Sequence, residues 1–137
     1  MITALVTDQV IAIQTLTDSV KTKQAGAVAT FCGDVRDNDA EKSVLSLTYE
    51  IHPSAQQVVE EITGRIAAKH DVLGVAVAHR YGQIPIGETA FAVVVSAVHR
   101  GPAFAACEEI VSTVKTELPI WKYQVFADGT SEWVNSA

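Results

Sequence analysis

The sequence predicts an α+β domain with a mixed or antiparallel sheet and two long helices. Helical spacing of apolar residues occurs in residues 52–70 and 101–118, among several shorter runs with strand character. Those runs follow one another through short turns that contain Pro, Gly or Asp-Gly, as hairpins do. Since hairpin neighbours pair antiparallel, we expect an α+β domain and not a doubly wound parallel sheet.

In the first half of the chain, alternating and β-branched residues predict strands in residues 3–13, 27–35 and 43–50. A short helix is expected in residues 13–22 and a polar loop in 36–42. The alternation in residues 43–50 predicts two faces, one with Val44, Ser46 and Thr48 and the other with Leu45, Leu47 and Tyr49. The helix in 52–70 has Pro53 in its first turn and an apolar stripe of Ala55, Val58, Val59, Ile62 and Ile66.

In the second half, strands are expected in residues 72–82 and 89–100, separated by a turn in 83–88. The helix in 101–118 has an apolar stripe of Phe104, Cys107, Ile110, Val111, Val114 and Leu118. Pro119 ends this helix, because its ring excludes helical geometry at the residue before it. A closing hairpin follows, with strands in 121–126 and 131–134 around an Asp-Gly turn.

Length and composition favour one folded domain, residues 1–137. The hydrophobic fraction of 48% and charged fraction of 19% are those of a chain with a core. The net charge of −6 argues against a general binder of nucleic acids or anionic membranes. No apolar run reaches the length of about 18 residues that a membrane span needs, and no secretory pattern begins the chain, so we expect a cytoplasmic protein.

The two cysteines do not form a metal or redox motif. Cys32 and Cys107 lie far apart without Cys-x-x-Cys spacing, so we expect reduced thiols and no zinc. Cys107 falls on a helical stripe and is expected in the core; for Cys32 core packing is favoured over a reactive thiol. The aspartates at 34, 37 and 39 resemble a turn more than a metal-binding loop.

Cations follow several predicted strands. Arg36, the pair His79-Arg80 and the pair His99-Arg100 each stand at a strand end. For a single arginine there a solvated surface position is favoured, and for a single histidine a structural hydrogen-bonding role is favoured over catalysis. The pair His99-Arg100 also precedes a helix, whose free N–H groups and positive dipole end suit a phosphate or carboxylate.

Two lysines flank the helix break at Pro119. Lys115 in the last helical turn interacts favourably with the helix carbonyls, and Lys122 can point outwards, so both have a structural explanation. The break nevertheless reverses the chain between them and lets the two ammonium groups approach each other. Each would then lower the proton affinity of the other, which suits a lysine for acid/base or nucleophilic chemistry.

Taken in order, five motifs resemble the MoaE family, the catalytic subunits of molybdopterin synthase. They extend from about residue 25 to residue 134 and read GAVATFCGDVRDND, LTYEIHPSA, VAVAHRYGQIPIGE, VVVSAVHRGPAFAA and VKTELPIWKYQVFADGTSEWV. The resemblance implies an α/β-hammerhead fold and a homodimer. It also implies a heterotetramer with a small ubiquitin-like subunit that ends in a Gly-Gly thiocarboxylate.

The reaction implied by the resemblance converts cyclic pyranopterin monophosphate to molybdopterin by inserting two sulfurs, without a metal or redox cofactor. By resemblance Lys115 and Lys122 are catalytic and lie near the thiocarboxylate, and His99 and Arg100 help to hold the pterin phosphate. The full set of implied substrate-contacting residues is Asp34, Val35, Arg36, His99, Arg100, Lys115, Lys122, Tyr123 and Gln124.

Two positions depart from the family pattern. Gln124 stands where the family often has a glutamate, and Asp34 stands where a neutral or basic residue is common. These departures motivate an alternative, a non-catalytic paralogue that binds the ubiquitin-like partner as a scaffold or regulator. A ferredoxin-like ligand-binding domain with solvated surface cations is a third interpretation.

Overall fold

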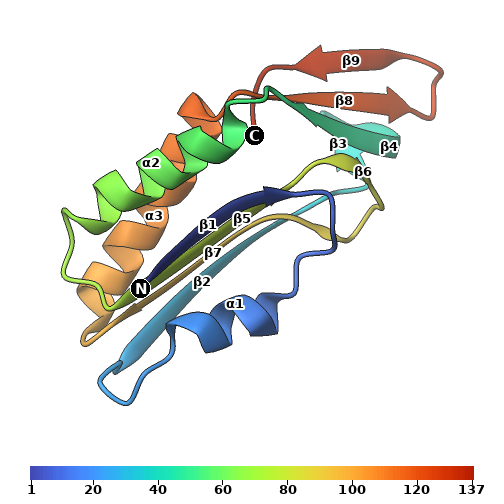
Figure 1. Ribbon diagram of the computed structural model, residues 1–137. Helices are drawn as coiled ribbons and strands as arrows, with labels where there is room; N and C mark the ends of the chain where they lie inside the picture. The colour runs from blue at the N-terminus through green and yellow to red at the C-terminus, as the bar shows by residue number, and fades with distance from the viewer.

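A four-stranded sheet forms the centre of the computed structural model, which describes residues 1–137 (Figure 1). Its strands, in spatial order, are β1 (Ile2–Thr7), β5 (Gly74–Arg80), β7 (Thr89–Ala97) and β2 (Ala27–Asp34). β1 pairs parallel with β5, whereas β5 with β7 and β7 with β2 pair antiparallel. β2 is therefore an edge strand with one neighbour.

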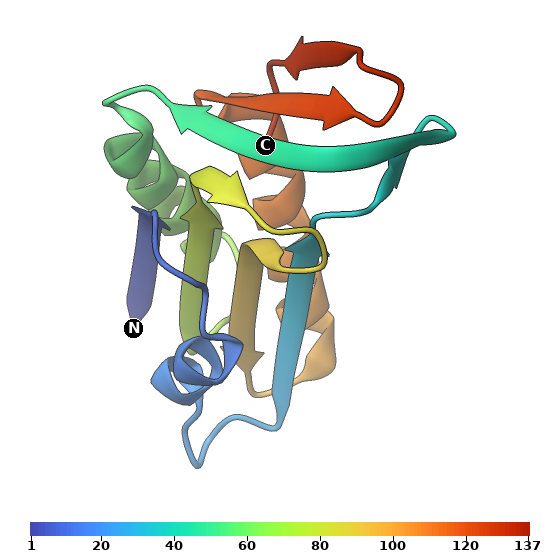
Figure 2. The same ribbon diagram turned by 90° about the vertical axis from the view of Figure 1, so that its right-hand side faces the viewer.

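A second sheet lies across one end of the first, as Figure 2 shows for β4, β8 and β9. Its strands are β3 (Asn38–Asp39), β4 (Lys42–Ile51), β8 (Ile120–Phe126) and β9 (Ser131–Val134), with the short β6 (Gly82–Ile84) paired to β4. The chain enters it after β2, again between β5 and β7, and a third time after α3. This arrangement confirms the α+β class with a mixed sheet and two long helices.

Helices cover both faces of the central sheet. They are α1 (Ile13–Val20), α2 (Ala55–Ala67) and α3 (Arg100–Glu117). Valines of β5 and β7 pack in one cluster with α2 and α3, and the residues between them pack in another with α1. Because both faces are buried, these strands read as continuous apolar runs instead of alternating ones.

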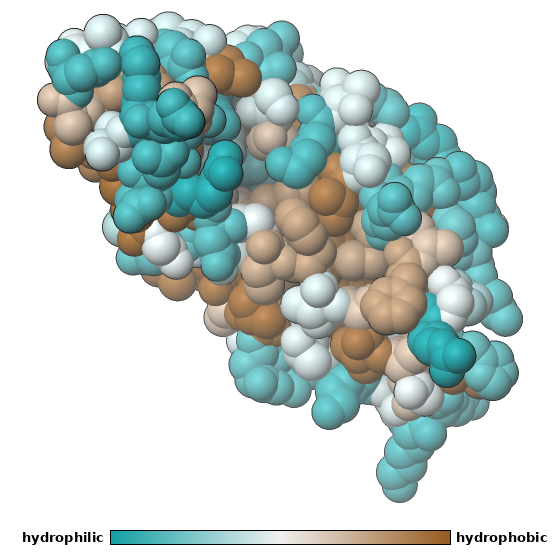
Figure 3. Space-filling model, turned by 180° about the vertical axis from the view of Figure 1, so that it is seen from behind, coloured by the Kyte–Doolittle hydropathy of each residue, from teal (hydrophilic) through white to brown (hydrophobic).

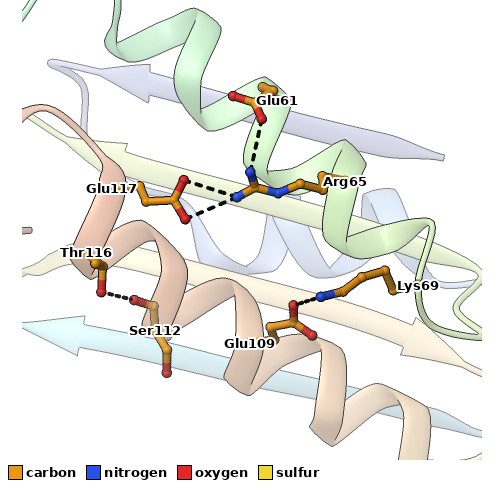
Figure 4. Close-up of polar contacts among 7 residues, drawn as sticks. All are labelled: Glu61, Arg65, Lys69, Glu109, Ser112, Thr116 and Glu117. Atoms are coloured by element: carbon orange, nitrogen blue, oxygen red, sulfur yellow. Dashed lines mark hydrogen bonds and ion pairs between the residues drawn. The ribbon is translucent and has the colours of Figure 1, made fainter.

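Ion pairs join the exposed sides of α2 and α3 (Figure 4). Arg65 on α2 lies 3.2 Å from Glu117 on α3 and 3.2 Å from Glu61 on its own helix. Lys69, just after α2, pairs with Glu109 on α3. These exposed pairs add little stability individually, and the buried contacts between Ile62, Ile66 and Ile110 dominate this interface.

Most predicted elements are confirmed, and the differences have local causes. The first strand ends at Thr7 and not at residue 13, since a turn precedes α1. The loop in 36–42 contains β3, and the turn in 83–88 begins inside β6. None of the three helices combines the length and apolar content needed to cross a membrane.

Two predictions of which side chains point into the core were wrong. A β-bulge between Val44 and Ser46 shifts the register of β4, so Val44 is buried and Leu45 is 61% exposed. Phe104 was expected on the buried stripe of its helix but is 64% exposed, and the small Ala103 and Ala106 take the inner positions. Phe104 lies instead at a surface groove that Phe31 also lines.

Candidate functional site

A pocket of about 160 Å³ lies between the two sheets. The end of β2, the start of β7, strands β4 and β8 and the last turn of α3 all contribute to its lining. Its charged and amide side chains are Asp34, Arg36, Asn38, Asp39, Lys115, Lys122 and Gln124. The pocket therefore contains three permanent or potential cations and two carboxylates, the arrangement expected for binding an anionic ligand with defined orientation.

The two lysines flanking Pro119 line this one pocket from different elements. Lys115 comes from the last turn of α3 and Lys122 from β8, where it pairs with Tyr49 of β4. Partial burial, followed by the positive charge of Lys122, lowers the pKa of Lys115. A lysine with a lowered pKa is neutral in a larger fraction of molecules, and the neutral amine is the form that accepts a proton or attacks a carbonyl.

The segment that carries Arg36 follows a β-bulge at the end of β2. The register shifts between Gly33 and Asp34, and Thr89 donates a 2.7 Å hydrogen bond to the Asp34 carboxylate. Val35 is buried, and its backbone exchanges hydrogen bonds with the backbone of Gly87 and Glu88. Val35 thus anchors the segment, while the Arg36 side chain is 77% exposed at the pocket.

Aromatic rings form the floor of the pocket. Tyr49 and Phe91 line it, and the buried His79 lies between them, stacked on Phe91 at 5.2 Å and edge-on to Tyr49 at 4.9 Å. The His79 Nδ1 lies 2.9 Å from the carbonyl oxygen of Arg80, so Nδ1 carries the proton of the neutral ring. Its Nε2 is buried without a partner, and burial lowers the pKa of His79 to about 4.

The segment after β9 also reaches the pocket. Ala137 is buried and lines it, and the Lys115 ammonium group lies 3.5 Å from the Ala137 carbonyl oxygen. A ligand that approaches Lys115 from this side must share the space with this segment or move it.

Three of the sequence-predicted residues lie outside the pocket. Tyr123 points to the opposite face of β8, where its ring packs on Trp133 at 4.8 Å. His99 and Arg100 are exposed at the start of α3, and Lys115 is 15 residues further along it. At 1.5 Å of rise per residue, roughly 22 Å separates this pair from Lys115 in the same chain.

Gln124 is in the pocket wall and is 3% exposed. Its amide nitrogen donates to Asp39 at 2.7 Å and to Glu132 at 3.1 Å. From the sequence, Gln124 was interpreted as a residue that replaces the family's glutamate, and Asp39 as part of a turn. Their contact was not predicted. Tyr49 and Phe91, which line the pocket, were missed because their strand patterns carry no signal beyond burial. His79 was considered only as a group at a strand end, and it is a buried ring packed against both of them.

The cysteines divide as follows. Cys107 is buried, as predicted, whereas Cys32 is exposed, which contradicts its predicted core packing. Cys32 lies on the face of the edge strand β2 that points away from α3, because it alternates with Phe31, which lies on the α3 side. Partial desolvation and then the nearby Asp34 raise the pKa of the Cys32 thiol, which disfavours the reactive thiolate. No group of three or more His, Cys, Asp or Glu side chains is arranged to hold a metal ion.

Comparison with known proteins gives consistent results. A profile of the family described as "MoaE protein" matches residues 6–117. A molybdopterin synthase catalytic subunit from Aspergillus niger is 39% identical over 115 residues, which cover 83% of this chain and 64% of that protein. Molybdopterin synthase catalytic subunit 1 of Mycobacterium tuberculosis is 36% identical over 129 residues, covering 93% and 87%.

Among solved structures, the crystal structure of molybdopterin synthase from Staphylococcus aureus superposes with a TM-score of 0.86, at 27% identity and 94% coverage of both chains. The chain spans between 56% and 64% of the length of the fungal and plant relatives that it matches.

Proposed function

The chain belongs to the MoaE protein family, and from that premise we propose that it is the catalytic subunit of a molybdopterin synthase. It would convert cyclic pyranopterin monophosphate to molybdopterin by transferring two sulfurs from the thiocarboxylate of a small ubiquitin-like subunit. The observation that carries this proposal is the meeting of Arg36, Lys115 and Lys122 in one pocket between the two sheets. The substrate is an anion and so is the sulfur donor, and a cationic pocket suits both.

The proposed roles of the pocket residues follow from their charge and position. Arg36 and Lys122 supply positive charge for the phosphate and the thiocarboxylate. Lys115, whose pKa is lowered, is suited to exchange a proton or to form a transient covalent bond during transfer. In each transfer the thiocarboxylate sulfur forms a carbon–sulfur bond on the substrate. Water then cleaves the acyl–sulfur bond to the partner, whose C-terminus is left as an ordinary carboxylate. The sulfur arrives on the partner, so neither Cys32 nor Cys107 is needed.

The partner's tail would enter the pocket beside Lys115. Glycines lack side chains and allow close approach of the backbone in a narrow channel. Ala137 lines the pocket on this side, so the tail would displace it or lie against it. The cytoplasm, where reduced thiols are normal, remains the predicted location of the reaction.

A homodimer would complete the pocket. The free edge of β2 and the exposed Phe104 border an apolar groove lined also by Phe31, Cys107 and Val111. Figure 3 shows this side of the molecule, behind the view of Figure 1, with apolar side chains gathered across its middle. Such a face, with unpaired backbone groups beside apolar side chains, is suited to association with a second copy.

The direction of β2 determines what a second copy would contribute. β2 begins at Ala27, which pairs with Ala97 just before His99, and it ends at Asp34 in the pocket wall. If two β2 strands pair antiparallel about a two-fold axis that passes between Thr30 and Phe31, Ala27 of the second copy lies opposite Asp34. With strands about 4.8 Å apart, Ala97 of the second copy lies within roughly 10 Å of Asp34. His99 and Arg100 of the second copy would thereby join Arg36 as anion-binding groups.

Reconstitution tests the proposed function. The purified chain, the thiocarboxylated small subunit and cyclic pyranopterin monophosphate should together yield molybdopterin. Lys115→Ala and Lys122→Ala should each reduce the rate by about 100-fold or more, the range for losing an acid/base group. Lys69→Ala, at an exposed site just after α2 and away from both the pocket lining and the β2 edge, is the matched control. An active wild type whose rate survives both pocket substitutions would refute the proposed roles of the lysines.

The scaffold alternative makes a different prediction for the same assay. A non-catalytic paralogue would bind the ubiquitin-like subunit and form no molybdopterin under conditions in which an established synthase is active. Turnover at a rate comparable to that synthase would exclude it. Failure of the small subunit to bind at all would exclude both the catalytic subunit and the scaffold.

A further inference from the structure

Gln124 connects two carboxylates that belong to different strands. It lies on β8, with Glu132 opposite it on β9, and its side chain reaches Asp39 on β3. The amide nitrogen has two hydrogens, and the two contacts, at 2.7 Å to Asp39 and 3.1 Å to Glu132, use both of them. A carboxylate at position 124 has no hydrogen to donate when ionised, and it would bring a third negative charge to the same place.

Asp39 in turn faces the arginine of the pocket. One of its oxygens accepts from Gln124, and the other lies 4.0 Å from the Arg36 guanidinium. Gln124 and Asp39 are much less exposed than Arg36, whose side chain is 77% accessible. Asp39 therefore links the buried amide of Gln124 to the exposed guanidinium of Arg36.

The hairpin of residues 36–42, which bears Arg36 and Asp39, has few contacts between its own two strands. β3 contributes only two residue pairs to β4, Asn38 with Ser43 and Asp39 with Lys42. The two residues of its turn, Ala40 and Glu41, have φ angles of 50° and 66°. Such a turn favours Asn and Gly, and side chains like these adopt it at a cost in free energy. A strained hairpin with a two-residue strand needs contacts outside itself to remain closed.

We propose that Gln124 is a positioning residue that holds the hairpin of residues 36–42 against the pocket, and so fixes Arg36 for binding of the substrate anion. The consequence for the substrate rests on the function proposed above, but the hold on the hairpin does not. Gln124 thus acts through Asp39 and needs no contact with the substrate itself.

Hydrogen exchange of the backbone amides tests the hold on the hairpin without any substrate. In Gln124→Glu, amides of residues 36–43 should exchange about tenfold faster or more, while the amides of the central sheet stay protected. Gln83→Glu adds the same charge at an exposed site on β6 and should leave this segment unchanged. If Gln124→Glu and Gln83→Glu exchange alike in residues 36–43, the proposal is wrong.

Two second-site changes distinguish this role from a general loss of structure. Replacing Ala40 and Glu41 by Asn and Gly supplies residues that suit the turn, and should slow exchange again in the Gln124→Glu chain. Asp39→Asn in the same chain reverses the donor and the acceptor and should restore part of the protection. If residues 36–43 exchange faster in Gln124→Glu and neither second-site change slows that exchange, the side-chain amide of Gln124 does not hold the hairpin closed.

Kinetics of the complex with the thiocarboxylated subunit test the link to Arg36. Gln124→Glu should raise KM for the pyranopterin by about tenfold and change kcat by less than about twofold. Lowering the pH should reduce the KM defect, because protonation removes the extra charge from the carboxylate cluster. If Gln124→Glu shows faster exchange in the hairpin but an unchanged KM, the proposed effect of Gln124 on substrate binding through Arg36 is wrong. If even the wild type forms no product, the proposed function fails and hydrogen exchange alone decides the hold on the hairpin.

Discussion

Lys115 at the end of α3 and Lys122 on β8 share one pocket, where partial burial and then the charge of Lys122 lower the pKa of Lys115. The pair is seven residues apart in sequence and is separated by Pro119, which ends the helix. The backbone turns at Leu118, whose φ of −67° and ψ of 125° are extended and not helical. The chain then runs directly into β8 and returns Lys122 toward the helix end.

Replacing Lys122 by Met should raise the pKa of Lys115, because one of the two causes of its depression is removed. The pKa should remain below that of an exposed lysine, since the burial is unchanged. Reductive methylation with a carbon-13 label and an NMR titration of the free chain measure it, with Lys115→Arg to assign the signal. Lys21→Met, at an exposed position, should leave the Lys115 titration where it is in the wild type. An identical Lys115 titration in the Lys122 and Lys21 variants would contradict the proximity of the two charges.

A site shared across a dimer predicts complementation between two inactive variants. A Lys115→Ala chain and an Arg100→Ala chain each spoil every pocket in their own homodimers. In a hybrid dimer, one pocket carries both substitutions and the other carries neither. Random re-mixing should therefore restore about one quarter of wild-type activity in the reconstitution assay. If each pocket uses only its own chain, the mixture stays inactive.

His79 should make the fold sensitive to acid. Its pKa is about 4 in the folded chain against 6.5 in an exposed histidine, so the unfolded state binds its proton first as the pH falls. The contribution of His79 to the free energy of unfolding is complete above about pH 7. It is lost as the pH falls from 6.5 to 4, and below that it no longer changes. A shift of this size corresponds to roughly 3 kcal/mol.

Urea unfolding of wild type and His79→Phe at pH 7 and pH 4.5 measures this contribution. The variant loses the hydrogen bond to the Arg80 carbonyl at both pH values, so its absolute stability is not the readout. The loss of stability between the two pH values should be smaller in the variant than in the wild type. Equal losses would mean that His79 is solvated or protonated in the folded chain.

Two glycines offer a matched pair of stability tests. A Cβ added at Gly26 would lie 2.5 Å from the backbone oxygen of Val98, so Gly26→Ala should cost about 1–3 kcal/mol. A Cβ at Gly64 in α2 meets nothing within 4 Å, and Gly64→Ala should stabilise the helix by about 0.5–1 kcal/mol. Thermal or urea unfolding measures both. A neutral Gly26→Ala would show that β2 and the end of β7 are not closely packed there.

Local pattern predicted the elements well wherever side chains repeat with a regular period. The stripe of α2 and the alternation that buries Leu47 and Tyr49 are of this kind. Pattern failed where a tertiary contact changes the register, as at the bulge beside Val44. It also failed on α3, where Ala103 and Ala106 are buried and the larger Phe104 is exposed.

For the candidate site, the sequence indicated the three cations but not their surroundings. Arg36, Lys115 and Lys122 stand beside breaks in secondary structure, which are visible as Gly, Asp and Pro. The contact between Gln124 and Asp39 joins residues 85 apart in the chain, and no local propensity encodes such a contact. The sequence motifs assigned His99 and Arg100 to the same site as Lys115, whereas the length of α3 separates Arg100 from Lys115 by roughly 22 Å within one chain.

The sequence by itself determined the class of the fold, the family motifs and the helix break between the lysines, since each depends on residues close together in the chain. The tertiary structure decided which cations share a pocket, what lies beneath them and which residues hold the Arg36 hairpin. Those features depend on how the second sheet packs across the end of the first, and packing between distant segments is set by the register and volume of the whole core.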